Sequence, residues 1–172
     1  ATPSILGIDP DAFVINSFSK YFGMTGWRLG WLVAPEAAVA DLEKLAQNLF
    51  ISMSTMAQYA ALAAFEPATR AILDERRDTF RQRRDFLYPA LLELGFDIPC
   101  KPEGAFYIYA NASRFTDDSQ AFCLSLLEEH GVAVTPGLDF GRHRASEHLR
   151  FSYTTGMDRL ELAVERLARV LT

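Results

Sequence analysis

A short apolar run passes directly into a hydroxyl-rich stretch near the start of this 172-residue chain. Val14-Ile15 is followed at once by Asn16-Ser17-Phe18-Ser19-Lys20, and glycines come soon after: Gly23, Gly26 and Gly30. Adjacent β-branched residues are typical of a buried strand, and glycines let the chain turn sharply. The pattern therefore predicts a buried strand whose end presents Lys20 on a tightly folded loop.

Lys20 and Arg28 give this loop an amine and a guanidinium eight residues apart. Partial burial near other positive charge favours the neutral form of a lysine amine, which attacks a carbonyl to give a Schiff base. The planar fork of Arg28 matches two phosphate oxygens, and the hydroxyls of Ser17 and Ser19 can donate to the same group. A lysine and an arginine at this spacing are also typical of solvated surface charges. Together with the hydroxyls, however, they fit pyridoxal phosphate, whose aldehyde and phosphate both need anchoring.

The whole stretch 17–31, Ser-Phe-Ser-Lys-(x)2-Gly-Met-Thr-Gly-Trp-Arg-Leu-Gly-Trp, resembles the lysine segment of class I/II aminotransferases. These are fold type I pyridoxal-phosphate enzymes similar to aspartate aminotransferase. The resemblance implies a protein that moves an amino group between an amino acid and a 2-oxo acid. It makes Lys20 the catalytic lysine, which forms the aldimine with the cofactor and moves a proton as general acid and base. It assigns Ser17, Ser19 and Arg28 to the cofactor phosphate.

A second part of the chain carries the same resemblance. Residues 132–141 look like the family's Pro-Gly-x-x-Phe-Gly turn, and residues 148–153 look like its Leu-Arg-hydrophobic-Ser strand. In that family the arginine holds the α-carboxylate of the substrate, which makes Arg150 the substrate-binding residue. From the strand alone, Arg150 either lies on a solvated face or turns inward toward an anion, because an unpaired buried guanidinium is too costly.

Composition limits the other possible functions. Hydrophobic residues make up 49% of the chain and charged residues 23%, so we expect a soluble protein without membrane association. The net charge of −5 does not favour binding of nucleic acid. The arginines at 76–84 are interspersed with acidic residues, as on a solvated helix face. Two cysteines without motif spacing indicate a reduced, cytoplasmic interior, and three histidines without ligand spacing predict no metal.

Hydrophobic periodicity predicts the order of helices and strands. Helices are expected over 36–50, 57–65, 67–95, 119–130 and 158–171, and strands over 104–109, 132–135 and 149–153. Pro89 predicts a kink or a break in the third helix, and Gly95 predicts its left-handed end. The aromatic run 106–109 is expected to pack in the core or an interface rather than to form a substrate site.

This order predicts an α/β protein that matches the second half of a fold type I chain. Residues 1–66 correspond to the truncated tail, a C-terminal remnant, of the large cofactor-binding domain. Residues 67–172 correspond to the long inter-domain helix and the small C-terminal α+β domain. The resemblance also implies a homodimer.

Several parts of the family's site come before its lysine strand. They include an acidic partner of the pyridine nitrogen, a ring-stacking aromatic and a glycine-containing phosphate loop. Only nineteen residues precede Lys20, and none of them matches these motifs. We therefore expect this chain by itself to lack transaminase activity, and its unpaired strand edges to favour association.

Two other functions stay open at this point. Some transcription regulators carry an aminotransferase-like domain that senses the cofactor without turnover. Pyridoxal-phosphate carbon–sulfur lyases and decarboxylating relatives use the same lysine, so the cofactor is better specified than the reaction.

Overall fold

The computed structural model describes residues 3–171. The chain divides into two compact units, Ala1–Arg77 and Asp78–Thr172, which are described separately below. The border lies inside the long helix α3 (Pro67–Glu93), whereas the sequence suggests a border at the start of that helix.

An antiparallel hairpin carries the lysine segment in the first unit. β1 (Val14–Ser17) pairs with β2 (Gly30–Val33), and Ser17 lies opposite Gly30. The predicted strand is confirmed, but its predicted burial is wrong, because Ile15 is 82% exposed. Among residues 3–171, β2 is the only strand that pairs with β1, and a two-stranded ribbon cannot cover both of its own faces.

Two predicted helices follow this hairpin. They are α1 (Glu36–Leu49) and α2 (Thr55–Ala63). Ser54 caps α2, since its hydroxyl accepts a hydrogen bond from the Ala57 amide at 3.5 Å, as the Ser-Thr pair in the sequence predicts. A small buried cluster holds α2 against the lysine segment: Phe18, Met24, Ala61 and Ala64.

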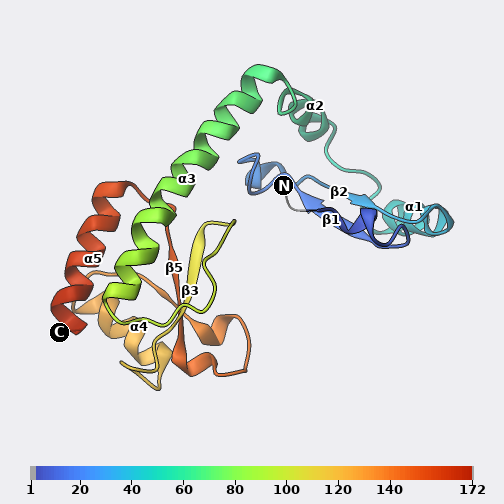
Figure 1. Ribbon diagram of the computed structural model, residues 1–172. Helices are drawn as coiled ribbons and strands as arrows, with labels where there is room; N and C mark the ends of the chain where they lie inside the picture. The colour runs from blue at the N-terminus through green and yellow to red at the C-terminus, as the bar shows by residue number, and fades with distance from the viewer. Residues whose placement is uncertain (1–2, 172) are drawn as a thin grey trace. The chain divides into compact units, whose positions relative to one another are not determined.

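Helix α3 is a single long helix, coloured green in Figure 1. The predicted break at Pro89 does not occur, although proline removes the hydrogen bond to the carbonyl of Asp85. Leu87 and Leu91 lie on either side of Pro89 and are 3% and 0% exposed, so their packing offsets the lost bond. The helix ends before Gly95, which adopts the predicted left-handed conformation at φ 98°.

The second unit is built on a three-stranded antiparallel sheet. The strand order is β3 (Tyr107–Asn111), β5 (His148–Ser152), β4 (Thr135–Pro136). β3 begins later than predicted, and β4 has only two residues, because Pro136 has no N–H with which to extend the ladder. Alternate residues along β5 point to opposite faces of the sheet: Leu149 and Phe151 are buried, whereas Arg150 is half-buried on the other face.

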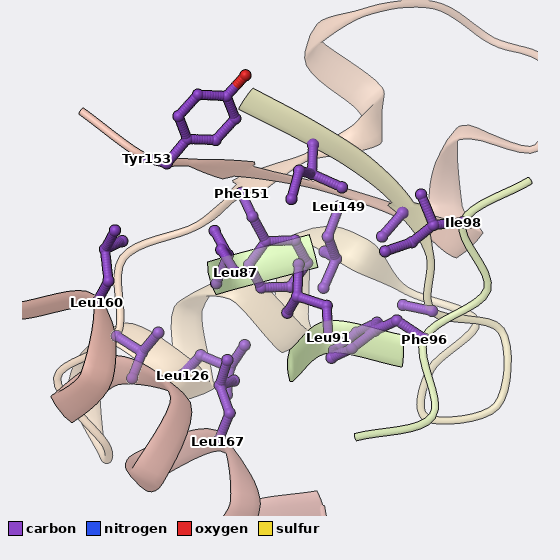
Figure 2. Close-up of a cluster of buried hydrophobic side chains, with 14 of the residues drawn as sticks. Leu87, Leu91, Phe96, Ile98, Leu126, Leu149, Phe151, Tyr153, Leu160 and Leu167 are labelled. Carbon is purple, nitrogen blue, oxygen red and sulfur yellow. The ribbon is translucent and has the colours of Figure 1, made fainter. Parts of the chain in front are cut away.

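One face of this sheet packs against three helices to form the main core. These are the second half of α3, α4 (Ser119–Glu128) and α5 (Met157–Leu171). Figure 2 shows side chains from the sheet and the helices directed toward one another: Leu87, Leu91, Leu126, Leu149, Phe151, Leu160 and Leu167. Because the core occupies one face of the sheet, the polar and aromatic residues of β3 and β5 gather on the other.

Charged side chains on α3 pair along the helix. Arg77 contacts Asp74 at 3.0 Å and Arg81 contacts Asp78 at 3.0 Å, as on the predicted solvated face. The prediction is wrong for Arg83 and Arg84, which are half-buried and donate to the carbonyls of Thr154 and Pro102. Within residues 3–171, every helix is too short or too polar to cross a lipid bilayer.

Candidate active site

The loop after β1 is shaped by the two serines predicted to bind the cofactor. The Ser17 hydroxyl accepts a hydrogen bond from the Ser19 amide at 3.0 Å and donates to the Ser19 hydroxyl at 2.9 Å. Phe18, between them, is buried and anchors the loop, so both hydroxyls are held at the end of the strand. This is an ST-turn, in which a serine hydroxyl bonds the backbone amide two residues on.

Lys20 begins the next turn of this loop. The Gly23 amide donates to the Lys20 carbonyl at 3.0 Å, and Gly23 takes a left-handed φ of 67° that other residues rarely adopt. The Met24 amide then donates back to the Phe18 carbonyl at 3.0 Å, which closes the loop on its buried anchor. Lys20 is exposed rather than partly desolvated.

Arg28 is connected to the serines through Thr25. The Thr25 hydroxyl donates to the Ser19 carbonyl at 2.6 Å, and Arg28 Nη1 donates to the Thr25 carbonyl at 3.0 Å. Arg28 itself has the left-handed backbone, with φ 53° and ψ 49°, a conformation that costs a non-glycine residue about 1 kcal/mol or more. The structure thus gathers Ser17, Ser19, Thr25 and Arg28 into one hydrogen-bonded segment.

Sequence reasoning missed Thr25. Thr25 stands between Gly23 and Gly26, the glycines that predicted the turn. Its hydroxyl is the signal that could have been used, since a threonine in a tight turn commonly bonds a nearby backbone group.

Tyr21 ties the lysine segment to the start of α3. Its hydroxyl donates to the Asp74 carboxylate at 2.9 Å, and Asp74 also accepts the ion pair from Arg77. The hydrogen bond to Asp74 raises the pKa of the Tyr21 phenol above its ordinary value. This contact could not be predicted from local sequence patterns, because the two residues are 53 positions apart.

The donors of this segment suit a phosphorylated aldehyde. Arg28 supplies a charged donor for a phosphate and the Ser19 hydroxyl a neutral one, while the Ser17 hydroxyl donates to Ser19; Lys20 supplies an amine for an aldehyde. The left-handed Arg28 also fits a ligand site, since strained non-glycine residues concentrate at such positions. The residues present are therefore compatible with pyridoxal phosphate.

The second unit holds Arg150 at the centre of the sheet face opposite the core. The strand register places Tyr109 on one side of it and Thr135 on the other. Arg150 Nη2 donates to the Thr135 hydroxyl at 3.2 Å. The guanidinium carbon lies 4.9 Å from the ring centre of Phe140 and 5.5 Å from that of Tyr107, both within cation–π range.

One polar atom in this arrangement has no hydrogen-bond partner among the described residues. It is the Nε of Arg150, which is also buried. A buried charged group normally has its donors satisfied. This Arg150 therefore differs from a solvated surface arginine and has part of its bonding capacity unused.

An open hollow of about 490 Å³ lies over this face. Its lining includes Tyr107, Tyr109, Phe140, Arg142, His143 and Arg150. The expectation for the aromatic run 106–109 is thus only partly right. Ile108 is fully buried and Phe106 packs against the core, but the alternation of the strand turns Tyr107 and Tyr109 to the hollow.

Aromatic stacking holds the wall of this hollow. The ring of His148 stacks on that of Tyr109, with centres 5.0 Å apart and planes inclined by 12°. Phe140 meets Tyr109 edge-on at 6.0 Å. His148 Nδ1 lies 2.8 Å from the Arg144 carbonyl, which ties the loop before β5 to the same wall. Burial raises the pKa of the Tyr109 phenol, which stays neutral here.

Gly137 lets the chain pass close beneath this wall. A Cβ at that position would lie 2.8 Å from the Tyr109 hydroxyl and 2.9 Å from the His148 carbonyl, and would also collide with the Ala145 carbonyl. Only glycine fits, so the Pro-Gly of the sequence motif has a steric reason in this fold.

Comparison with known proteins places both segments in one family. The family described as aminotransferase class I and II matches residues 2–167, nearly the whole chain. This chain belongs to the class I and II aminotransferases. The match includes the lysine segment and the Arg150 strand, so the resemblance noted in the sequence is confirmed.

Several characterised aminotransferases are similar to this family member. It is 40% identical to the valine–pyruvate aminotransferase of Mycobacterium tuberculosis over 157 residues, which cover 91% of this chain and 40% of that protein. It is 38% identical to the aspartate aminotransferase of Bacillus subtilis over 162 residues, again 91% and 40% of the two chains. This aminotransferase chain therefore spans about 40% of the length of the curated relatives that it matches.

Solved structures agree with the predicted α/β class. The crystal structure of an aminotransferase from Mycobacterium tuberculosis matches with a TM-score of 0.95 and 38% identity, covering 99% of this chain and 44% of that one. The aromatic aminotransferase of Pyrococcus horikoshii matches with a TM-score of 0.82 and 37% identity, covering 92% of this chain and 42% of that one. The fold of this aminotransferase chain is thus the fold of its family.

Proposed function

We propose that this chain supplies the lysine and arginine parts of a pyridoxal-phosphate-dependent aminotransferase. In this role the protein moves an amino group between an amino acid and a 2-oxo acid. The observation that supports the proposal is the hydrogen-bonded segment from Ser17 to Arg28, which includes Lys20 and lies in a chain that belongs to a family of aminotransferases. When bound, pyridoxal phosphate supplies an electron sink for the bonds of the substrate α-carbon.

Lys20 is the catalytic residue in this proposal. Its Nζ would hold the cofactor at the aldehyde carbon, and the amine, once released by the substrate, would act as the base that takes the proton from the substrate α-carbon and passes it to the cofactor. The turn closed by Gly23 and the buried Phe18 fixes the backbone of Lys20, whose side chain is exposed. This combination suits an amine that must bind and release the cofactor aldehyde in each catalytic cycle.

Arg28, Ser17 and Ser19 hold the cofactor phosphate. Arg28 contributes a charged fork and the serines contribute neutral donors, a mixture that both attracts and orients a phosphate. The bond from Arg28 to the Thr25 carbonyl limits the rotation of the guanidinium, and the Thr25 hydroxyl links the same turn to the Ser19 carbonyl.

Arg150 binds the α-carboxylate of the substrate. Its guanidinium lies within cation–π range of the rings of Phe140 and Tyr107 at one wall of an open hollow. These features favour a bound anion over a solvated surface position, because they desolvate the cation without neutralising it. A carboxylate is the planar anion that the guanidinium fork fits best.

We further infer the domain organisation of the family for this chain. Residues 1–66 belong to the large cofactor-binding domain, and residues 67–172 form the inter-domain helix and the small C-terminal domain. We expect this chain by itself to lack transaminase activity, because none of the nineteen residues before Lys20 matches the family motif that carries the acidic partner of the pyridine nitrogen. As in other members of the family, we expect a cytoplasmic homodimer.

Transamination is favoured over the other two functions considered. The relatives described above are aminotransferases, and none of their names denotes a lyase or a regulator. The amino-acid substrate itself is not specified by Arg150, because an α-carboxylate is common to all amino acids.

A trapping experiment tests the role of Lys20. The chain has three lysines, Lys20, Lys44 and Lys101, so the labelled position is easily assigned. Pyridoxal phosphate is added to the 172-residue chain and to an intact polypeptide, meaning one of the relatives' length that contains this chain. Borohydride then reduces the adduct, and peptide mass spectrometry locates the labelled residue. We expect labelling at Lys20 that is lost in Lys20→Arg and kept in Lys44→Arg. Equal labelling of all three lysines in the intact polypeptide would refute the assignment.

A further inference from the structure

We propose that Thr135 is a positioning residue that sets the orientation of Arg150 for the substrate carboxylate. The inference rests on the carboxylate-binding role proposed for Arg150 and extends it to a residue whose side chain need not touch the substrate. It is carried by one hydrogen bond, from Arg150 Nη2 to the Thr135 hydroxyl at 3.2 Å, and by the rings that flank the same guanidinium.

The backbone brings these two side chains together without any long-range adjustment. Thr135 in β4 and Arg150 in β5 are direct cross-strand partners, so their side chains leave the sheet on the same face. This is the face opposite the core, where Tyr109 flanks Arg150 from β3. The pairing therefore places a hydroxyl next to the stem of the arginine that points to the hollow.

The Thr135 hydroxyl is held in place by its own sequence context. Pro136 follows it, and the residue before a proline is confined to extended backbone conformations. A β-branched side chain is also stiff at its first torsion. Because its backbone and side chain are both restricted, the Thr135 hydroxyl has few accessible positions. The hydrogen bond to Arg150 therefore costs little conformational entropy.

The flanking rings and the hydroxyl restrict different motions of the guanidinium. Phe140 and Tyr107 attract the cation through their π faces. This attraction depends little on how the guanidinium is rotated about its own axis. A hydrogen bond is directional. The bond to Thr135 therefore selects one rotation of the fork among those that the rings allow.

The selected rotation leaves donors for a carboxylate. A guanidinium has N–H groups on Nε and on both Nη atoms. Nε is buried, and Thr135 takes one hydrogen of Nη2. The second hydrogen of Nη2 and those of Nη1 remain for the two oxygens of an anion that approaches end-on. Without Thr135 the fork can rotate, and this matched pair of donors is presented for less of the time.

The test measures carboxylate binding rather than turnover. Acetate is the probe, because it carries a carboxylate and no other polar group, and its dissociation constant is measured by titration calorimetry on an intact, cofactor-loaded polypeptide. Thr135→Val keeps the shape and removes the acceptor, so we expect the dissociation constant to rise about 3- to 10-fold. Thr135→Ser restores the hydroxyl and should recover most of the affinity. Thr135→Ala serves as a second variant without a hydroxyl if the valine variant does not fold.

Two further variants separate this inference from the role of Arg150. Thr154→Val makes the same change at an exposed threonine just after β5 and should leave the acetate affinity unchanged. Arg150→Lys should lose more affinity than any Thr135 variant, because a point charge cannot reproduce the fork.

The outcomes are distinguishable. If Arg150→Lys weakens acetate binding but both variants without the hydroxyl bind like the wild type, Thr135 has no positioning role and the role of Arg150 stands. If Thr135→Ser is as weak as Thr135→Val, packing rather than the hydroxyl matters, and the inference is overturned. If the wild type does not bind acetate, or Arg150→Lys binds it equally well, the carboxylate role of Arg150 is wrong and the inference falls with it.

Discussion

The guanidinium carbon of Arg150 lies 4.9 Å from the centre of the Phe140 ring. These residues come from different segments, a strand and the turn that follows Pro136-Gly137, and the two sequence motifs that contain them meet at this contact. A charge placed over an aromatic face is partly desolvated yet still attracted to the ring quadrupole. The contact therefore holds the Arg150 guanidinium at the hollow, but it does not neutralise the charge as a bound anion would.

Phe140→Leu should weaken carboxylate binding in an intact polypeptide while cofactor binding is kept. Loss of a partly desolvated cation–π contact corresponds to about a 2- to 5-fold rise in the dissociation constant of acetate. Phe115→Leu is the matched control, because Phe115 also lies under an arginine, Arg114, at 5.7 Å but away from this hollow. An equal effect of both substitutions would show that general loss of aromatic packing, not the Arg150 contact, is responsible.

Thr25→Val should weaken cofactor binding, because the Thr25 hydroxyl holds the segment between Ser19 and Arg28. Loss of this hydrogen bond should raise the dissociation constant of pyridoxal phosphate about 3- to 10-fold, as measured by absorbance titration of an intact polypeptide. Thr25→Ser keeps the hydroxyl and should bind nearly as the wild type does. Unchanged binding by the valine variant would mean that the loop keeps its shape without this bond.

Gly137→Ala should destabilise the 172-residue chain by about 1–3 kcal/mol, the usual cost of overpacking. The new methyl group would meet the Tyr109 hydroxyl and two backbone carbonyls, and backbone cannot move aside easily. Gly141→Ala is the control, since a Cβ there meets nothing within 4 Å. Its effect should be no more than about 0.5 kcal/mol. Denaturant unfolding of both variants makes the comparison, and equal stabilities would contradict the steric argument.

The two cysteines should differ in reactivity. Burial, with a smaller contribution from the charge of Asp139, raises the pKa of the Cys123 thiol to about 11, whereas Cys100 is exposed. Only the thiolate reacts with a disulfide reagent, so at about pH 8 we expect one equivalent of fast labelling, at Cys100. Cys123 should react only after denaturant is added. Fast labelling of Cys123 in the native chain would show that the core around α4 opens readily.

Tyr21 should make stability depend on alkaline pH. Its folded-state pKa is raised because the protonated phenol donates to Asp74, so the stabilising effect is fully present below the unfolded pKa of about 10. It is lost as the pH rises through the folded pKa. The difference in unfolding free energy between the wild type and Tyr21→Phe should therefore be constant below about pH 10 and shrink above it. A difference that stays constant across that range would argue against the bond.

The sequence determined the features that depend on neighbouring residues in the chain. The periodic apolar positions predicted α1 through α5, and the left-handed end at Gly95 and the cap at Ser54 followed from single residues. The strings around Lys20 and Arg150 were also sufficient to place the chain in its family. These signals are local, because helix periodicity, caps and tight turns are set within a few residues.

Only the tertiary structure decided which residues meet across the chain. Thr135 faces Arg150 because β4 and β5 pair in one register, and a slip of β4 by one residue would turn Thr135 to the core. In the same way, the sheet turned Tyr107 and Tyr109 to the hollow rather than to the core. The exposure of Ile15 could not be predicted either, because a β-branched pair specifies a strand, whereas burial depends on what packs against it.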